Sequence, residues 1–151
     1  MQGRRFLEVA QRLGLEEGEP FLRNRVGRAY YAAYLEARQF CEQHVLYTRT
    51  KSSREHQDVL EMIRDSDPDL VVKLAILRKY RNTADYDMDI SMDAIARNAE
   101  DGEAFAIEII ARLDAIVSAG ARAAADATDA AGEPRQAKPI VPDGTTPLGD
   151  S

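Results

Sequence analysis

Arg81 and the polar residues that follow it are the part of the chain best suited to chemistry. Helical spacing places Arg81 on the same stripe as Leu77, so a permanently charged guanidinium falls among apolar side chains and needs a partner, a ligand or water. Asp85 stands four residues on and can pair with it, while Asn82 and Tyr86 add hydrogen-bonding groups. Such a set suits RNA or nucleotide chemistry, because arginine binds phosphate in a bidentate manner. The alternative is an ion pair at a helix end that only fixes packing.

A second group of arginine and tyrosine side chains lies in an earlier predicted helix. Arg28 and Tyr31 are three residues apart and share a helix face. An arginine there can hold a phosphate, and a base stacked on an aromatic ring contributes roughly 1 to 3 kcal/mol. Arg78 and Lys79, which precede Arg81, add positive charge for phosphate contacts. Tyrosines at helical spacing also serve as core or interface residues, so this alternative stays open.

His56 is the candidate acid or base among the remaining residues. It stands in the first turn of a predicted helix, where the helix dipole lowers the pKa of a histidine and favours anions. The other interpretation is a surface residue near a helix cap. The single cysteine, Cys41, falls on an apolar stripe, which predicts a buried and unreactive thiol.

Neither a metal site nor a cofactor site is predicted. The chain has no glycine-rich phosphate loop and no pair of histidines at the spacing of metal ligands. The aspartates within residues 85–93 lack the glycine and the terminal glutamate of a calcium loop. We expect these carboxylates to cap helices and to stay hydrated.

Apolar residues at helical spacing predict five helices, and no strand pattern appears. The first ends at Gly14, the second starts at Pro20, and Ser91 is a good N-cap for the fifth. The third begins with a capping box made by Ser52 and Glu55. The predicted helices cover about residues 6–13, 20–44, 52–64, 69–86 and 91–118.

The predicted architecture is one all-α domain over residues 1–118, because 151 residues leave no room for a second substantial core. In the fourth helix, Val72, Ile76 and Tyr80 form a second apolar row, which a dimer interface could cover. Residues 119–151 are rich in Ala, Gly, Asp, Thr and Pro and cannot bury enough apolar surface to become ordered. They are predicted to be a frayed helix end and a disordered tail.

The formal net charge of −6 argues against a general polyanion binder, but the charge is unevenly placed. Residues 4–81 carry 15 Lys and Arg against 12 Asp and Glu, whereas residues 85–118 carry 2 against 9. The fold could therefore place a basic groove beside an acidic helix; the alternative is a set of hydrated helix faces without a significant field. With one cysteine, no membrane-length apolar run and no signal-peptide pattern, we expect a cytoplasmic protein.

A pattern runs through residues 27–34 and 37–38, His56 and residues 78–86. It resembles the HEPN superfamily, in particular its short prokaryotic single-domain members, and it spans most of residues 1–118. The resemblance implies a bundle of four or five helices that forms a homodimer. It also implies a role in toxin–antitoxin or antiviral systems beside a nucleotidyltransferase partner, with many members acting as metal-independent ribonucleases.

The chain departs from this family in the ribonuclease motif. HEPN ribonucleases carry an arginine, four to six further residues and then a histidine, whereas residues 86–88, which occupy those positions after Arg81, include none. The resemblance therefore leaves Arg81, Asp85 and Tyr86 as catalytic candidates, with His56 as a substitute proton-transfer group.

Two functions remain open from the sequence. The first is an RNA- or nucleotide-binding protein, possessing or lacking ribonuclease activity, that acts as the toxin of a toxin–antitoxin or defence system. In some such toxins a tyrosine is modified with AMP by the nucleotidyltransferase antitoxin, and Tyr86 occupies a related place. The second is a non-catalytic helical interaction module that binds a nucleotidyltransferase or another protein. For the first function the predicted ligand contacts are Arg28, Tyr31, Arg78, Lys79 and Asn82.

Overall fold

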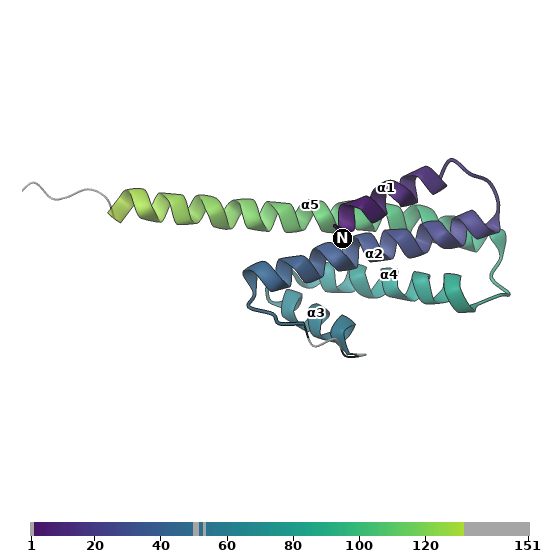
Figure 1. Ribbon diagram of the computed structural model, residues 1–151, viewed down its shortest axis with the longest axis horizontal. Helices are drawn as coiled ribbons and strands as arrows, with labels where there is room; N and C mark the ends of the chain where they lie inside the picture. Colours follow the sequence, from purple (N-terminus) through teal and green to yellow (C-terminus); the bar gives the residue numbers. More distant parts are fainter. Residues whose placement is uncertain (1, 50–51, 53, 132–151) are drawn as a thin grey trace, which may run out of the picture.

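Five α-helices make up the described part of the chain, and no strand occurs within it. The computed structural model describes residues 2–49, 52 and 54–131. The all-α class predicted from the sequence is confirmed, and none of the described helices is long and apolar enough to cross a membrane. The helices form a bundle (Figure 1): α1 Gly3–Leu13, α2 Glu19–His44, α3 Glu55–Arg64, α4 Pro68–Tyr86 and α5 Met92–Ala131.

Helix α2 lies at the centre of the bundle and contacts each of the other four helices. Small buried residues such as Ala29, Ala33 and Ala37 let its neighbours approach closely. Across from them, α4 contributes Leu77 and α5 contributes Ile109 to the main core. Burying one such aliphatic side chain stabilises the fold by roughly 1.5 to 3 kcal/mol. The core therefore fixes α4 against α2, which sets the groove described below.

A smaller core closes the end of the bundle at which α4 finishes and α5 begins. There Val26 of α2 packs with Ala84 of α4 and Ile95 of α5. Arg23 fastens this end, because its guanidinium donates hydrogen bonds to the carbonyl oxygens of Ala84 at 2.6 Å and Asp87 at 2.9 Å. These bonds satisfy carbonyl groups that the end of α4 leaves free. They also hold the connection between α4 and α5 against the start of α2.

The five helices begin close to their predicted positions, but the cap of α3 and the end of α5 differ from the prediction. The Ser91 hydroxyl accepts a hydrogen bond from the amide of Ala94 at 3.3 Å, so the predicted N-cap of α5 is confirmed. At α3 the predicted capping box is not formed, since the helix begins at Glu55 and its N-cap position has no side-chain cap. The Glu55 carboxylate instead pairs with Arg38 at 3.4 Å and Arg49 at 3.1 Å. Arg38 of α2 and the nearby Arg49 therefore bind the carboxylate that the capping box would have used.

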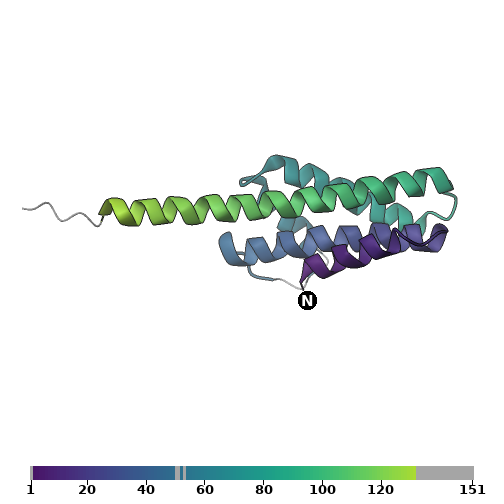
Figure 2. The same ribbon diagram turned by 90° about the horizontal axis from the view of Figure 1, so that it is seen from above.

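Helix α5 corrects the predicted start of the tail. A frayed helix end and a disordered tail were expected over residues 119–151, whereas α5 continues as a regular helix to Ala131 and extends past the bundle (Figures 1 and 2). Residues 119–129 are all exposed, so this part of the helix buries little surface against the described residues. Its alanines have the highest helix propensity of all residue types, which explains why the helix persists there. Residues 132–151, the rest of the predicted tail, lie outside the described residues.

Candidate functional site

A groove lies between α2 and α4, beside the smaller core. It encloses a pocket of about 330 Å³ and brings together four residues that the sequence singled out, namely Arg28 and Tyr31 of α2 with Arg81 and Asp85 of α4. The remaining lining residues are Arg23, Asn24, Gly27 and Ala84. Two arginines and a tyrosine from separate helices thus reach one pocket although about 50 residues separate them in the chain. We call this pocket the α2–α4 groove.

Arg81 occupies the centre of the interactions on the α4 side. Its Nε lies 2.6 Å from the Asp85 carboxylate, so the predicted ion pair is confirmed. A terminal guanidinium nitrogen donates a hydrogen bond to the Asn82 side-chain oxygen at 3.3 Å. The guanidinium carbon also stands 5.9 Å from the ring centres of both Tyr31 and Tyr86. Since the Arg81 side chain is 26% exposed and a guanidinium has five N–H donors, it retains donors for a ligand.

Tyr31 is held by aromatic rings on two sides. Its ring centre lies 6.0 Å from that of Phe6 and 5.2 Å from that of Tyr30. These distances fall within the range of favourable aromatic pairs. A ring fixed in this way is a ready platform for stacking a planar base, because little side-chain entropy remains to be lost on binding.

Arg28 is the least neutralised cation of the groove. Its guanidinium lies 5.5 Å from the ring centre of Phe6, and it forms no ion pair with any described acidic residue. Arg78, one turn before Arg81 on α4, likewise lacks an acidic partner within the part of the chain that the structure describes. Both side chains therefore keep a full positive charge available for an anion.

His56 does not line the α2–α4 groove. Its Nδ1 lies 2.6 Å from the Tyr30 hydroxyl, and its ring centre lies 4.1 Å from that of Tyr34. Burial lowers the pKa of His56, and the positive charge of Arg78 lowers it further. Burial also raises the pKa of the Tyr30 hydroxyl, which therefore stays protonated. The tautomer of the neutral His56 ring decides which of the two groups donates the hydrogen bond between them.

His56 and Arg81, the two groups that the predicted RNA cleavage would bring together, are therefore held apart. A row of contacts runs from His56 to Tyr30, from Tyr30 to Tyr31, and from Tyr31 to Arg81, and no direct contact joins His56 with Arg81 among the described residues. His56 instead lines a separate cavity of about 10 Å³ with Arg78. That cavity is too small to admit a nucleotide.

The other predicted site residues lie at the edge of the groove or away from it. Asn82 and Tyr86 share an open hollow with Arg81, and Tyr86 is 74% exposed. Lys79 is exposed on α4 and lines none of the pockets described here. Cys41 is buried as predicted, and burial raises the pKa of its thiol to about 12.

Sequence reasoning missed Asn24 and Gly27. Both precede Arg28 and Tyr31 at helical spacing, which is the signal that would have placed them on the same face. A Cβ atom built on Gly27 would meet no atom within 4 Å, so this residue leaves one wall of the groove open. The described residues contain no group of three or more His, Cys, Asp or Glu that could hold a metal ion.

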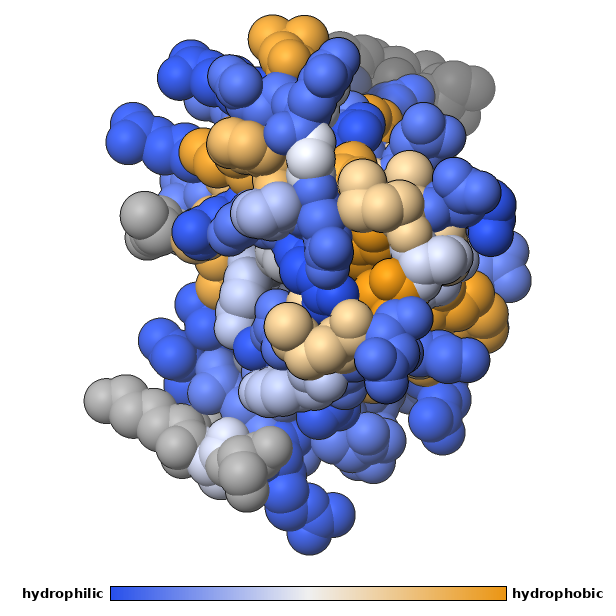
Figure 3. Space-filling model, turned by 90° about the vertical axis from the view of Figure 1, so that its right-hand side faces the viewer, coloured by the Kyte–Doolittle hydropathy of each residue, from blue (hydrophilic) through white to orange (hydrophobic). Residues whose placement is uncertain are grey.

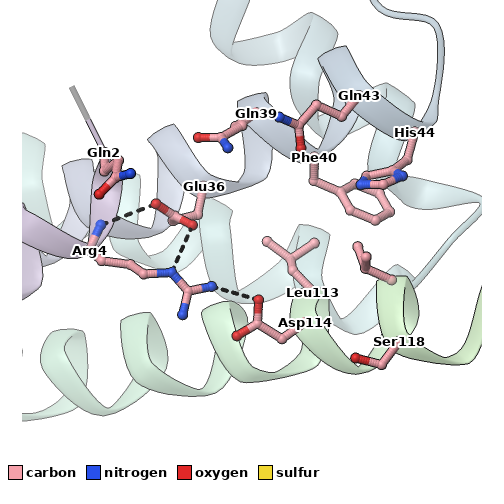
Figure 4. Close-up of a pocket in the computed structure, with 11 residues that line it drawn as sticks. Gln2, Arg4, Glu36, Gln39, Phe40, Gln43, His44, Leu113, Asp114 and Ser118 are labelled. Carbon is pink, nitrogen blue, oxygen red and sulfur yellow. Dashed lines mark hydrogen bonds and ion pairs between the residues drawn. The ribbon is translucent and has the colours of Figure 1, made fainter. Parts of the chain in front are cut away.

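A different hollow, of about 530 Å³, lies where the start of α1 meets α2 and α5 (Figure 4). It contains none of the predicted site residues. Its central cation, Arg4, is bound on both sides, to Glu36 at 3.3 Å and to Asp114 at 2.6 Å. The charges of this hollow are thus already paired, and they fasten α1 to its neighbours. The α2–α4 groove, with an unpaired arginine and a fixed aromatic ring, is better suited to a charged ligand.

Comparisons of the chain with protein-family models, curated proteins and solved structures gave no match. The resemblance to the HEPN superfamily stays a prediction that its three motif segments carry.

Proposed function

We propose that this protein binds RNA or a nucleotide in the α2–α4 groove. The observation that carries the proposal is the convergence of Arg28 and Arg81 from two helices on one pocket, with the Tyr31 ring beside Arg81. Arginine supplies the planar donors that phosphate accepts, and the tyrosine ring supplies a face for a base. The resemblance to HEPN toxins makes RNA the first ligand to test.

In this proposal each side chain has a separate task. Arg28 binds a phosphate, because no acid neutralises it. Arg81 contributes its remaining N–H donors while Asp85 and Asn82 hold it in place. Tyr31 stacks a base, and Arg78 adds long-range attraction from the adjacent turn of α4. Because these contacts involve phosphate and ring faces, they favour single-stranded RNA without strong preference for sequence.

Cleavage of the RNA would be a further step, and the groove of one chain lacks a group that it needs. A ribose 2′-hydroxyl needs a base to take its proton, and such a group typically contributes about 10² to 10⁴ in rate. The groove contains no histidine, and His56 is bound to Tyr30 instead. In a toxin of this design the missing group would come from the second subunit of a homodimer or from the partner protein.

The second candidate function is a non-catalytic interaction module that binds a nucleotidyltransferase or another protein. The close pairing of Arg81 with Asp85 favours it, because these two catalytic candidates neutralise each other's charge within α4. Tyr86, 74% exposed next to Arg81, would then be available to a partner that transfers AMP. Intact-mass analysis after incubation with ATP and that enzyme tests this possibility: an adduct absent from Tyr86→Phe supports it, and no adduct rejects it.

The decisive experiment is a titration of labelled single-stranded RNA by fluorescence anisotropy at several salt concentrations. Arg28→Ala and Arg81→Ala should each weaken binding and reduce the salt slope by about 0.7 per lost phosphate contact. The matched control is Arg122→Ala, since Arg122 is exposed on the part of α5 beyond the bundle. Equal affinities for all four proteins, or no binding by the wild type, would reject the proposal.

The same preparations should be incubated with the RNA in EDTA. Cutting by the wild type that Arg81→Ala abolishes would establish a metal-independent ribonuclease. Binding without cutting by the folded protein would favour the non-catalytic candidate or one that depends on a partner.

A further inference from the structure

Large apolar side chains are exposed at the end of the bundle opposite to the free end of α5. Leu15, in the connection between α1 and α2, is 85% exposed. Met88, in the connection between α4 and α5, is 77% exposed, and Phe21 and Met92 at the adjacent helix starts are exposed as well. Exposed apolar groups that gather in one place commonly mark a site of interaction. We refer to Leu15, Phe21, Met88 and Met92 as the end patch.

The two connections that carry the end patch lie side by side in both ribbon views (Figures 1 and 2). The hydrogen bonds from Arg23 to Ala84 and Asp87 hold the start of α2 against the end of α4. Figure 3 views this end directly and shows apolar side chains gathered between hydrophilic ones. The start of α2 and the connection between α4 and α5 are thus fixed relative to each other, and the smaller core joins the same three helices.

The segments that carry the end patch are rich in carboxylates, and most of these form no ion pair with a described residue. Over residues 14–23 and 85–93 the one basic residue is Arg23, which is itself bound to Glu19 at 2.7 Å. The acidic residues of these segments that form no ion pair with any described residue are Glu16, Glu17, Asp87, Asp89 and Asp93. Arg25, whose guanidinium reaches Gly14, is itself paired with Glu103, so the net charge of these segments stays negative.

The exposed apolar side chains and the unpaired carboxylates together favour one kind of binding partner. A nucleic acid would be repelled by the carboxylates, and a second copy of the same end would bring like charges together. A helix with an apolar face and flanking Lys or Arg matches both features, since its apolar residues meet Leu15 and the methionines while its cations meet the carboxylates. Methionine is flexible and polarisable, which suits a surface that adapts to such helices.

We propose that the end patch is a docking surface for basic amphipathic helices of a partner protein. The surface is separate from the α2–α4 groove, because none of Leu15, Phe21, Met88 and Met92 lines that pocket. The proposal therefore does not depend on RNA binding, and the two can fail independently.

The test uses the full chain labelled with ¹³C at the methionine methyl groups and assigned by single Met→Leu variants. The probe is a synthetic peptide of about four helical turns with leucine on one face and lysine on the other. The same peptide with glutamate in place of lysine is the charge control. Met62 of α3, which is also exposed but lies away from the end patch, is the internal control.

We expect the leucine–lysine peptide to shift the methyl signals of Met88 and Met92 in a saturable manner while Met62 stays unchanged. The leucine–glutamate peptide should cause no shift. The double variant Leu15→Gln with Met88→Gln should weaken peptide binding about tenfold, which corresponds to 1.4 kcal/mol, whereas Met62→Gln should leave it unchanged. RNA binding by the double variant should equal that of the wild type.

Three outcomes would overturn the proposal. The first is an absence of shifts at Met88 and Met92 at peptide concentrations up to the millimolar range. The second is an equal response of Met62 or an equal effect of the glutamate peptide, either of which would show nonspecific contact. The third is a shift that follows protein concentration without peptide, which would make a second copy the occupant.

Discussion

The Arg81 guanidinium and the Asp85 carboxylate lie 2.6 Å apart, one helical turn from each other on α4, and both line the same groove. The two residues of the ion pair are therefore also part of the candidate binding site. Asp85 has opposing effects there, since it holds Arg81 in position and cancels part of the charge that would attract phosphate. This relationship makes Asp85 the most informative position to change.

Asp85→Asn should increase RNA affinity by a few fold. The amide keeps a hydrogen-bonding oxygen near Arg81 but removes the negative charge, so the net charge of the groove rises by one. The pair is partly exposed, and such pairs contribute only about 0 to 1 kcal/mol to stability, so the midpoint of urea unfolding should change little. Anisotropy titrations at two salt concentrations measure the effect. Asp114→Asn is the control, and a loss of affinity in Asp85→Asn would show that orienting Arg81 matters more than its charge.

Gly27→Leu should block the groove while stabilising the helix. A Cβ atom at this position would meet no atom within 4 Å, and Gly27 lines the groove with Arg28 and Tyr31, so a leucine there occupies space that a ligand needs. Replacing a helical glycine also removes a cost of roughly 0.5 to 1 kcal/mol in backbone entropy. We expect a higher midpoint of unfolding together with an RNA affinity at least about tenfold lower.

Gly120→Leu is the matched control for this change. Gly120 is also helical, and a Cβ atom built on it would meet no atom within 4 Å, but it lies on α5 where that helix leaves the bundle. It should raise stability without changing RNA affinity. Undiminished affinity in Gly27→Leu would place the ligand outside the α2–α4 groove.

The sequence was sufficient to predict those features that depend on local spacing. The class of the fold, the Ser91 cap and the pairing of Arg81 with Asp85 each follow from residues within one or two turns of one another. The presence of Arg28 and Tyr31 on one helix face was predictable for the same reason.

The features that the sequence did not predict depend on contacts between distant elements. Glu55 was read as half of a local capping box, but Arg38 and Arg49 approach it only in the folded chain. His56 was considered as the partner of Arg81, whereas the packing of α3 on α2 directs it to Tyr30. The persistence of α5 to Ala131 was missed because lack of burial was taken to mean lack of helix. The high helix propensity of its many alanines offsets the lack of burial in this part of α5.

The outer face of α4 provides a test of the expected homodimer. Val72 is 58% exposed, and Ile76 on the same row is only partly covered, as expected for apolar side chains that a second subunit could bury. Val72→Asp should therefore shift the protein from dimer to monomer in sedimentation velocity, because a carboxylate would have to be buried in the interface. Val9→Asp on α1 is the control, since Val9 is also exposed. A wild-type monomer at every concentration, or a dimer unaffected by Val72→Asp, would contradict this prediction.

The bond between His56 and Tyr30 predicts how stability depends on pH. Burial lowers the folded-state pKa of His56 below its ordinary value of 6.5, so between these two values the unfolded chain binds more protons than the folded one. The contribution of His56 to stability is therefore fully present above about pH 6.5 and decreases as the pH falls toward the folded-state pKa. Protonation would also place a cation near Arg78, whose positive charge opposes it.

His56→Gln should make the unfolding free energy less sensitive to pH between about 7.5 and 5. The comparison is urea unfolding of wild type and variant at both pH values, because carboxylates elsewhere contribute equally to the two proteins and cancel in the difference. His44→Gln serves as the control, since His44 is exposed at the end of α2 and its ring lies against Phe40 rather than a hydrogen-bonding tyrosine. Tyr30→Phe tests the same bond from its other side and should also lower stability at pH 7.5, because the His56 Nδ1 loses its hydrogen-bond partner. Identical pH dependence in the wild type and His56→Gln would show that the ring titrates freely and that the bond to Tyr30 does not hold it neutral.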